Sequence, residues 1–182
     1  LDIAKERENK MPKIIKNVKE QLLSEARRQI EERGYAQTTV RSVAAACGIA
    51  VGTVYNYFPS KDMLIASFVA ADWLEAIGDL KEHPPGTAEE AIRSVYDLLS
   101  DFSKAHRALF TDHDAAKTFS AIFSERHKQL RDQLAVFFLP FCKEGNQKDP
   151  EFLSQFLSES VLTWAMADVE VEKLVTVLRK LC

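Results

Sequence analysis

The polar side chains with the most suggestive spacing lie in TTVRSVAAACGIAVGTVYNYFPSK, the segment from Thr38 to Lys61. If a short helix begins near residue 50, then Gly52, Thr53, Tyr55 and Asn56 face outward from it. An exposed helical face that carries Thr, Tyr and Asn suits the major groove of DNA. The spacing therefore predicts a surface for contact with duplex DNA.

Two short helices joined by a tight turn would hold this face in place. Gly48 occupies the turn, where glycine adopts φ > 0 without penalty, and Ala44 is small enough for the second helix to cross close over the first. The apolar side chains expected to face inward are Val43, Cys47, Ile49 and Val54. An ordinary corner between two helices is the alternative, but so many position-specific demands met together favour a helix-turn-helix.

The segment TTVRSVAAACGIAVGTVYNYFPSKDML, with the preceding helix that ends in ERGY, resembles the DNA-binding domain of the TetR family of transcriptional regulators. The resemblance is strong from about residue 22 to about residue 64 and elsewhere extends only to length and helical pattern. The helical pattern along the chain, with no convincing strand, predicts an all-α protein of about nine helices. Residues 1–61 would form an N-terminal helix-turn-helix DNA-binding domain, and residues 62–182 a larger helical effector-binding and dimerisation domain.

DNA contacts are expected at nine positions. Those that match phosphate contacts in the family, or lie at the start of the first motif helix, are Thr39, Arg41, Thr53, Tyr55 and Lys61. Those that match positions near base edges are Val51, Gly52, Asn56 and Tyr57. Asn can bond adenine through two hydrogen bonds, and Val can pack on a thymine methyl group. The alternative for each is a solvated side chain or, for Tyr57, partial burial.

The sequence departs from the family pattern at Ala50, where the family often has Ser. The recognition helix then lacks a side-chain cap, which costs roughly 1 kcal/mol. Thr39 and Ser60 are expected to cap the helices on either side of it.

Charge is divided between the two parts of the chain, although the whole has a net charge of −3. Residues 1–61 hold 11 Lys and Arg against 7 Asp and Glu, a net of +4. Residues 62–182 hold 13 against 20, a net of −7. A basic first part on an acidic second part fits a phosphate-binding module attached to a domain that does not touch DNA.

The remaining composition is ordinary for a globular protein, with 46% hydrophobic and 28% charged residues. No apolar run approaches the ~20 residues that span a bilayer, and no export leader is visible. Three cysteines without CxxC spacing fit a reduced, cytoplasmic protein. Met11 is a candidate start, with the ten residues before it a leader or an addition.

Helical periodicity and breaks continue through the chain. The first helix is expected over about 13–33, and Pro84-Pro85-Gly86 is the strongest break. A capping box over Thr87–Glu90 should start the next helix, and Pro140 should kink or end a long helix that begins near residue 115. Asp149 followed by Pro150 should start another helix, and a last one should follow at about 169–181.

Two sites are expected in the second part. Aromatic side chains between helices suggest a cavity for an unknown small, apolar or aromatic effector, although most such residues simply pack a core. The candidates are Trp73, Phe102, Phe110, Phe119, Phe123, Phe137 and Trp164. The resemblance further implies that the last two helices form a four-helix bundle across a two-fold axis. Candidates for that interface are Phe152, Phe156, Val161, Leu174 and Leu178.

Catalysis and metal binding find little support. HExxH, GxSxG and GxxxxGK[ST] are absent from the sequence, so no enzymatic activity and no cofactor are expected. His113 lies between Asp112 and Asp114, but this spacing does not bring three ligands together, and Asp114 is expected to cap a helix.

The sequence, with its resemblance to the TetR family, predicts a homodimeric repressor of a palindromic operator, released by a small molecule. The alternative is a helical small-molecule-binding or protein-interaction module without sequence-specific DNA binding.

Overall fold

The computed structural model describes residues 17–144 and 148–181, except for the side chains of residues 118–125. This part of the chain folds into ten helices and no strand, which confirms the all-α prediction. The helices are α1 (Val18–Gln37), α2 (Val40–Cys47), α3 (Val51–Tyr57), α4 (Lys61–Glu82), α5 (Ala88–Ala105), α6 (Arg107–Phe110), α7 (His113–Ala135), α8 (Leu139–Glu144), α9 (Pro150–Met166) and α10 (Val171–Leu178). The predicted helix start near residue 13 and the candidate start Met11 lie outside the described residues.

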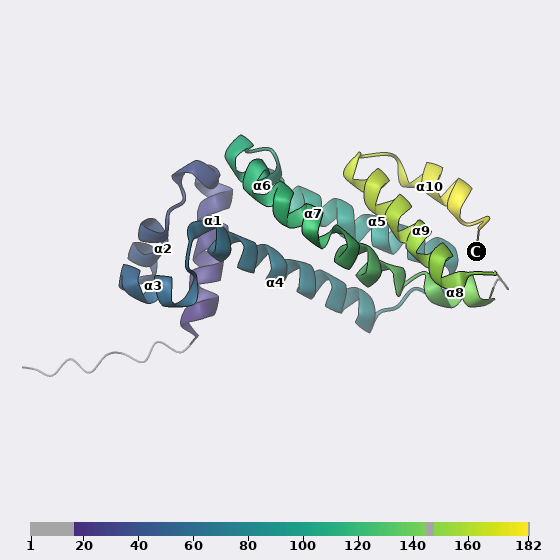
Figure 1. Cartoon of the computed structure of the whole chain (residues 1–182), viewed down its shortest axis with the longest axis horizontal. Coiled ribbons are helices and arrows are strands. Elements are labelled where there is room, and N and C mark those ends of the chain that lie inside the picture. Colours follow the sequence, from purple (N-terminus) through teal and green to yellow (C-terminus); the bar gives the residue numbers. More distant parts are fainter. Residues whose placement is uncertain (1–16, 145–147, 182) are drawn as a thin grey trace, which may run out of the picture.

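The molecule is elongated, with α1, α2 and α3 at one end and α8, α9 and α10 at the other (Figure 1). α4 begins among the first group and runs along the molecule toward the second. We call residues 18–71 the head and residues 72–178 the body. None of the helices in the described residues is long and apolar enough to cross a membrane.

The head core is built from buried side chains of α1–α4 and closed by two residues of the body. Leu22 and Ala26 of α1 and Val43 of α2 are fully buried in it. Leu109 of α6 and Ala115 of α7 belong to the same cluster. The hydrophobic cluster around the helix-turn-helix therefore continues past the domain boundary predicted after residue 61, which itself remains a prediction.

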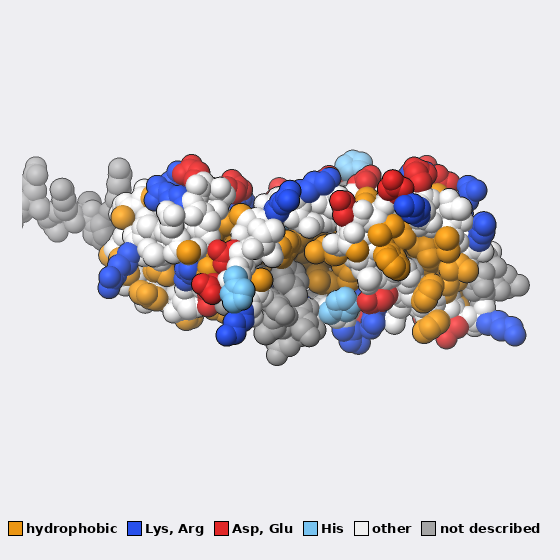
Figure 2. Space-filling model, turned by 90° about the horizontal axis from the view of Figure 1, so that it is seen from above, with side chains coloured by type: hydrophobic (Ala, Val, Ile, Leu, Met, Phe, Trp, Pro, Cys, Tyr) orange, Lys and Arg blue, Asp and Glu red, His pale blue; other side chains and the backbone are white. Residues whose placement is uncertain are grey.

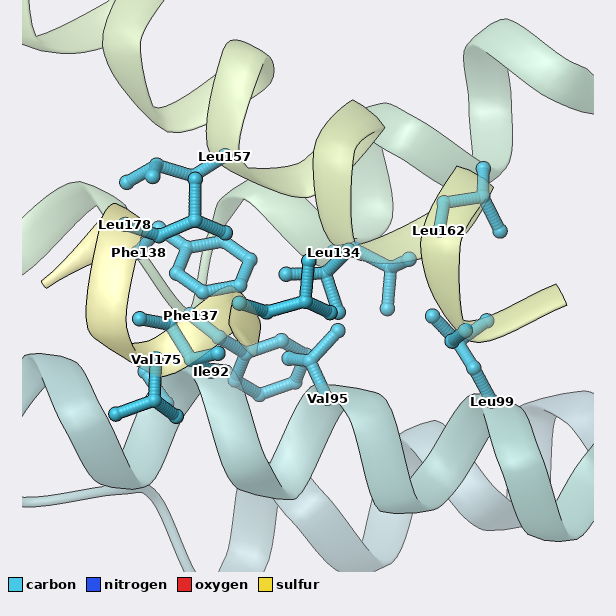
Figure 3. Close-up of a cluster of buried hydrophobic side chains, with 14 of the residues drawn as sticks. Ile92, Val95, Leu99, Leu134, Phe137, Phe138, Leu157, Leu162, Val175 and Leu178 are labelled. Carbon is cyan, nitrogen blue, oxygen red and sulfur yellow. The ribbon is translucent and has the colours of Figure 1, made fainter. Parts of the chain in front are cut away.

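The body core lies between α5, the end of α7, α9 and α10. Ile92, Val95 and Leu99 recur at helical spacing on α5, so they form one apolar stripe. Figure 3 shows this stripe facing side chains of the other elements. Those labelled there are Leu134, Phe137, Phe138, Leu157, Leu162, Val175 and Leu178.

Further contacts lie where the head meets the body. Phe102 of α5 packs against both hydrophobic clusters, with its ring in an edge-on contact 5.3 Å from the Trp73 ring. Arg27 of α1 donates through Nε to the Asp72 carboxylate of α4 at 3.1 Å and through Nη2 to the other carboxylate oxygen. His106 Nε2 lies 3.3 Å from Asp72 Oδ2. Hydrophobic and charged contacts thus meet at the middle of the molecule.

The predicted helix starts are largely confirmed by side-chain hydrogen bonds. Ser60 accepts from the Met63 amide at 3.1 Å, and Asp149 accepts from the Phe152 amide at 2.9 Å. Thr87 likewise accepts from the Glu90 amide at 3.1 Å. The Glu90 carboxylate instead accepts from the Gly86 amide at 2.8 Å, so only half of the predicted capping box forms.

The long helix expected to run through Pro140 is two helices, α7 and α8. The chain turns after Ala135, and Pro140 falls in the first turn of α8, where its missing N–H costs no helical hydrogen bond. This split gives one helix more than the nine expected. α1 also contains a break, because Gly34 adopts a φ of 77° just after the predicted helix end at Arg33.

Candidate nucleic-acid interface

The turn between α2 and α3 has the predicted geometry. Gly48 adopts a φ of 66° and a ψ of 29°, the left-handed conformation that costs glycine least. The Ile49 amide donates to the Ala44 carbonyl at 2.9 Å and so closes the end of α2. A Cβ atom on Gly48 would meet no heavy atom within 4 Å, so the requirement for glycine here is conformational and not steric.

α3 rests on the head core through its inner face and leaves its outer face open. Val54 is fully buried, as expected, and Phe58 is nearly so. Ala44 and Val43 of α2 are also fully buried, whereas Cys47 and Ile49 pack against the cluster from a half-buried position. Tight contact between two small helices fixes the orientation of the opposite face of α3.

That opposite face carries the residues predicted to contact DNA. The Tyr55 and Tyr57 side chains are 50% and 47% exposed, and Gly52 and Asn56 are exposed as well. Val51 and Thr53 are half-buried. The exposed part of α3 therefore presents two phenols and one carboxamide, groups that can reach both phosphates and base edges.

The start of α2 is fixed by a network that the sequence showed only in part. The Thr39 hydroxyl accepts from the Ser42 amide and the Ser42 hydroxyl accepts from the Thr39 amide, both at 3.0 Å, as a complete capping box. Ser42 also donates to the side chain of Gln29, which is buried and anchored by a 2.7 Å hydrogen bond to Glu25. Gln29 was missed because its partner Ser42 lies 13 residues further along the chain.

Arg41 and Lys61, the two predicted cationic contacts, differ in their surroundings. Arg41 is exposed and has no ion-pair partner among the described residues. The Lys61 ammonium donates to the Tyr35 carbonyl at 2.9 Å and lies 3.5 Å from the centre of the Tyr35 ring. The Tyr35 hydroxyl donates in turn to Asp62. Burial lowers the pKa of Lys61, and a phosphate contact would require it to leave or share the Tyr35 carbonyl.

The predicted weak point of α3 is present. Ala50 precedes the helix in an extended conformation and supplies no side-chain hydrogen bond to it. The first turn of α3 is therefore less constrained than that of α2. Of the 11 basic residues in the first 61, five precede residue 17 and lie outside the described residues.

A groove where the head meets the body differs from the aromatic cavity that was predicted. It has a volume of about 710 Å³ and lies between α1, α4 and α5. Its lining residues are Arg27, Asp72, Glu75, Ala76, Asp79, Leu80, His83, Ser94, Leu98, Asp101, Phe102, Ala105 and His106. Among the predicted effector contacts whose side chains the structure describes, Phe102 is the one that lines it.

The other predicted effector contacts lie elsewhere. Trp73 is buried against Phe102, where its indole N–H donates to Gln133 at 2.8 Å, and Phe137 is buried in the body core. Phe110 is half-buried beside His106, with the two ring centres 6.4 Å apart. Trp164 is 48% exposed on α9 and is not among the residues that line this groove. The side chains of Phe119 and Phe123 lie outside the described residues.

Comparison with known proteins identifies the family of this architecture. Residues 22–68, which run from the second turn of α1 to the first third of α4, match the model described as "Bacterial regulatory proteins, tetR family". The chain belongs to the TetR family. Within that family, α2, α3 and the turn at Gly48 are the DNA-binding helix-turn-helix, and the protein is a DNA-binding transcriptional regulator.

TetR-family relatives match both the head alone and most of the chain. The transcriptional repressor KstR of Rhodococcus jostii is 36% identical over 72 residues, which are 40% of this chain and 32% of KstR. The fatty acid metabolism regulator protein of Bacillus subtilis is 29% identical over 167 residues, 81% of this chain and 84% of that protein.

Solved TetR-family structures share the fold at low identity. FadR of Thermus thermophilus, solved in complex with lauroyl-CoA, superposes with a TM-score of 0.56 at 20% identity, over 90% of this chain and 92% of that one. The repressor AlkX of a Dietzia strain gives a TM-score of 0.59 at 16% identity, over 90% and 96% of the two chains. The shared architecture therefore includes the body as well as the head.

The residues predicted to form a TetR-type dimer interface divide into two groups. Phe152 and Phe156 of α9 are exposed, and Val161, Leu174 and Leu178 are buried in the body core of their own chain, which corrects their assignment to an intersubunit surface. Trp164 and Val177 are exposed on the same two helices and were not predicted for this surface.

The histidine flanked by carboxylates does not assemble a metal site. The His113 side chain is 94% exposed, and its Nδ1 lies 3.5 Å from the carboxylate of the neighbouring Asp114. In the described part of the chain, no three His, Cys, Asp or Glu side chains lie close enough to hold a metal ion. The helix cap is Asp112 and not Asp114 as expected, since Asp112 accepts from the amides of Asp114 and Ala115.

Proposed function

We propose that this TetR-family regulator is a cytoplasmic repressor that binds a palindromic operator as a homodimer and releases it when a small molecule binds the body. The observation that carries this proposal is the outer face of α3, where Tyr55, Asn56 and Tyr57 are exposed on a helix whose opposite face is buried. These exposed side chains do not pack in the head core, and a helical face of this kind suits a major groove of DNA.

The homodimer is supported by the apolar surface of α9. Phe152, Phe156 and Trp164 recur at multiples of four residues, so they follow one side of the helix, and they are 65%, 47% and 48% exposed. Figure 2 shows hydrophobic side chains gathered over the end of the molecule where α9 and α10 lie. Large exposed apolar patches mark interaction sites, and the same face on a second copy would cover this one.

Pairing of two copies also meets a requirement of the head. A single helix-turn-helix contacts few base pairs, so two recognition helices spaced by about one turn of duplex, roughly 34–36 Å, normally read two half-sites together. Release then requires a conformer in which that spacing is wrong. A small molecule shifts the balance only by its difference in affinity for the two conformers.

Two measurements test the proposal. Enrichment of a random-sequence DNA pool on the purified protein should yield a two-fold symmetric site, and binding to it should weaken steeply as salt concentration rises. Sedimentation should give twice the mass of the chain. Failure of the pool to enrich any sequence at low salt would exclude sequence-specific DNA binding by this chain.

A further inference from the structure

The groove between α1, α4 and α5 is lined by both apolar and acidic side chains. On α4, Asp72, Glu75 and Asp79 recur at three- and four-residue intervals, so their side chains share the face that lines the groove. Asp101 of α5 adds a fourth carboxylate, and the apolar lining residues include Leu80, Leu98 and Phe102.

Few positive charges offset these carboxylates. Arg27 is paired with Asp72, and Lys104 lies 3.4 Å from Asp101 at the exposed rim. Glu75 and Asp79 have no ion-pair partner among the described residues. Burial lowers the pKa of His106. The nearby Asp72 carboxylate acts in the opposite direction and Arg27 lowers the pKa further, with a net decrease. At neutral pH this imidazole therefore adds no positive charge to the groove. His83, the other histidine of the lining, contacts the Asp79 carbonyl at 3.3 Å.

We propose that this groove binds an organic cation with an apolar tail, and that the ligand acts by drawing Asp72 away from Arg27. The tail would lie along Leu80, Leu98 and Phe102, while the cationic group would lie among the α4 carboxylates. A volume of about 710 Å³ falls in the range of drug-sized ligands, roughly 300–1,000 Å³. The ring of Phe102 offers the same cation a further favourable contact.

The position of the groove gives such a ligand control over the head. Arg27 belongs to α1, which carries the helix-turn-helix, and its two hydrogen bonds to Asp72 tie α1 to α4. Phe102, which lines the groove, also packs against both hydrophobic clusters. A cation that competes with Arg27 for Asp72 therefore loosens the head from the body at their junction. This regulatory step depends on the proposed function, whereas the binding step does not.

The charge of the groove argues against a ligand of the kind held by one solved TetR-family structure. FadR of Thermus thermophilus was solved with lauroyl-CoA, whose phosphates are negatively charged. Four carboxylates along the lining would repel such a head group. The two ligand classes can therefore be distinguished with probes that share the same twelve-carbon tail.

Calorimetric titration of the full chain with dodecyltrimethylammonium, dodecanol and lauroyl-CoA tests the binding step. We expect the cation to bind most tightly, and a Glu75→Gln, Asp79→Asn double variant to bind it about tenfold more weakly. Asp97→Asn, on an exposed part of α5 outside the groove, is the matched control and should bind as the wild type does. Tighter binding of lauroyl-CoA than of the cation, or equal binding by the double variant, would overturn the proposal.

Mobility shifts with the enriched DNA site test the regulatory step. The cation should weaken the wild-type complex, and Asp72→Asn should weaken it without ligand and respond less to the cation. If the cation binds in the groove but leaves the DNA complex unchanged, the proposed competition with Arg27 for Asp72 is wrong, whereas the proposed binding site is retained. If no sequence is enriched at all, the proposed function fails, while the calorimetric result remains valid.

Discussion

Two exposed faces of this molecule, the outer side of α3 and the outer side of α9, differ in the chemistry that they offer. α3 exposes Tyr55 and Tyr57, whose rings carry hydroxyl groups, whereas α9 exposes Phe152 and Phe156, whose rings carry none. The first face keeps its hydrogen-bonding groups in water until a polar partner replaces the water. The second gains only by excluding water, so it suits a partner that is equally apolar.

The contrast indicates how the two faces depend on each other. Changes on α3 should alter DNA binding and leave assembly intact. Changes on α9 should alter assembly first and DNA binding through it, because two half-sites must be engaged together. Variants of the two helices can test this order of dependence.

The largest effect is expected from charge on α9. Phe152→Asp with Phe156→Asp should give a folded monomer, since both side chains are exposed in the single chain. Affinity for the two-fold symmetric site should fall about a hundredfold or more, because the second half-site no longer benefits from a high effective concentration. Sedimentation and mobility shifts measure the two results, and a dimeric double variant would place the subunit interface elsewhere.

Variants of α3 should lower DNA affinity by less and should not change the oligomeric state. Tyr55→Ala should weaken binding to all sequences, whereas Asn56→Ala should cost roughly 1–3 kcal/mol at one base position and relax the preference there. Tyr55→Phe keeps the ring and removes the hydroxyl. If Tyr55→Phe binds as tightly as the wild type, the hydroxyl makes no phosphate contact.

Two glycines of the motif form a matched pair for stability. Gly48→Ala should lower the free energy of unfolding by about 1–2 kcal/mol, because alanine is strained at a φ of 66°. Gly52→Ala, in α3, should be neutral or stabilising by up to about 1 kcal/mol, since helices favour alanine. Neither Cβ atom would meet a neighbour within 4 Å, so the pair isolates backbone conformation. Equal denaturation midpoints for the two variants would contradict this explanation.

The smallest effect concerns pH and His106, which is only 5% exposed. Burial lowers its pKa from the ordinary 6.5, so below that pH the unfolded chain binds a proton that the folded chain does not. Stability should therefore fall as pH decreases below about 6.5. His106→Gln should make the free energy of unfolding depend less on pH. His113→Gln, at an exposed position, is the control and should leave the dependence unchanged. Denaturant titrations at several pH values measure both.

The head could be predicted residue by residue because its determinants are close in sequence. Gly48, the Thr39 cap and the missing cap at Ala50 each depend on neighbours within four residues, and all three are present as expected. Lys61 is the exception within the head. Its long side chain turns toward Tyr35, 26 residues earlier, and no local pattern reveals that choice.

The body was harder to predict because its determinants are far apart in sequence. α9 carries apolar residues on both sides, so the sequence did not distinguish buried Val161 from exposed Trp164. Aromatic residues, which suggested an effector cavity, largely pack the core instead, as Trp73 and Phe137 do. The groove is marked instead by Asp72, Glu75 and Asp79, whose spacing was visible in the sequence but whose facing helix was not.

Leu109 and Ala115, which close the head core, come from helices that follow the DNA-binding helices in the chain. A fragment that ended with α4 would lose two buried members of that core and expose the side chains that they cover. The head of this regulator should therefore not fold stably when it is separated from α6 and the start of α7. Chimeras that exchange heads between TetR-family relatives should fold well only when the region around α6 and the start of α7 is exchanged with them.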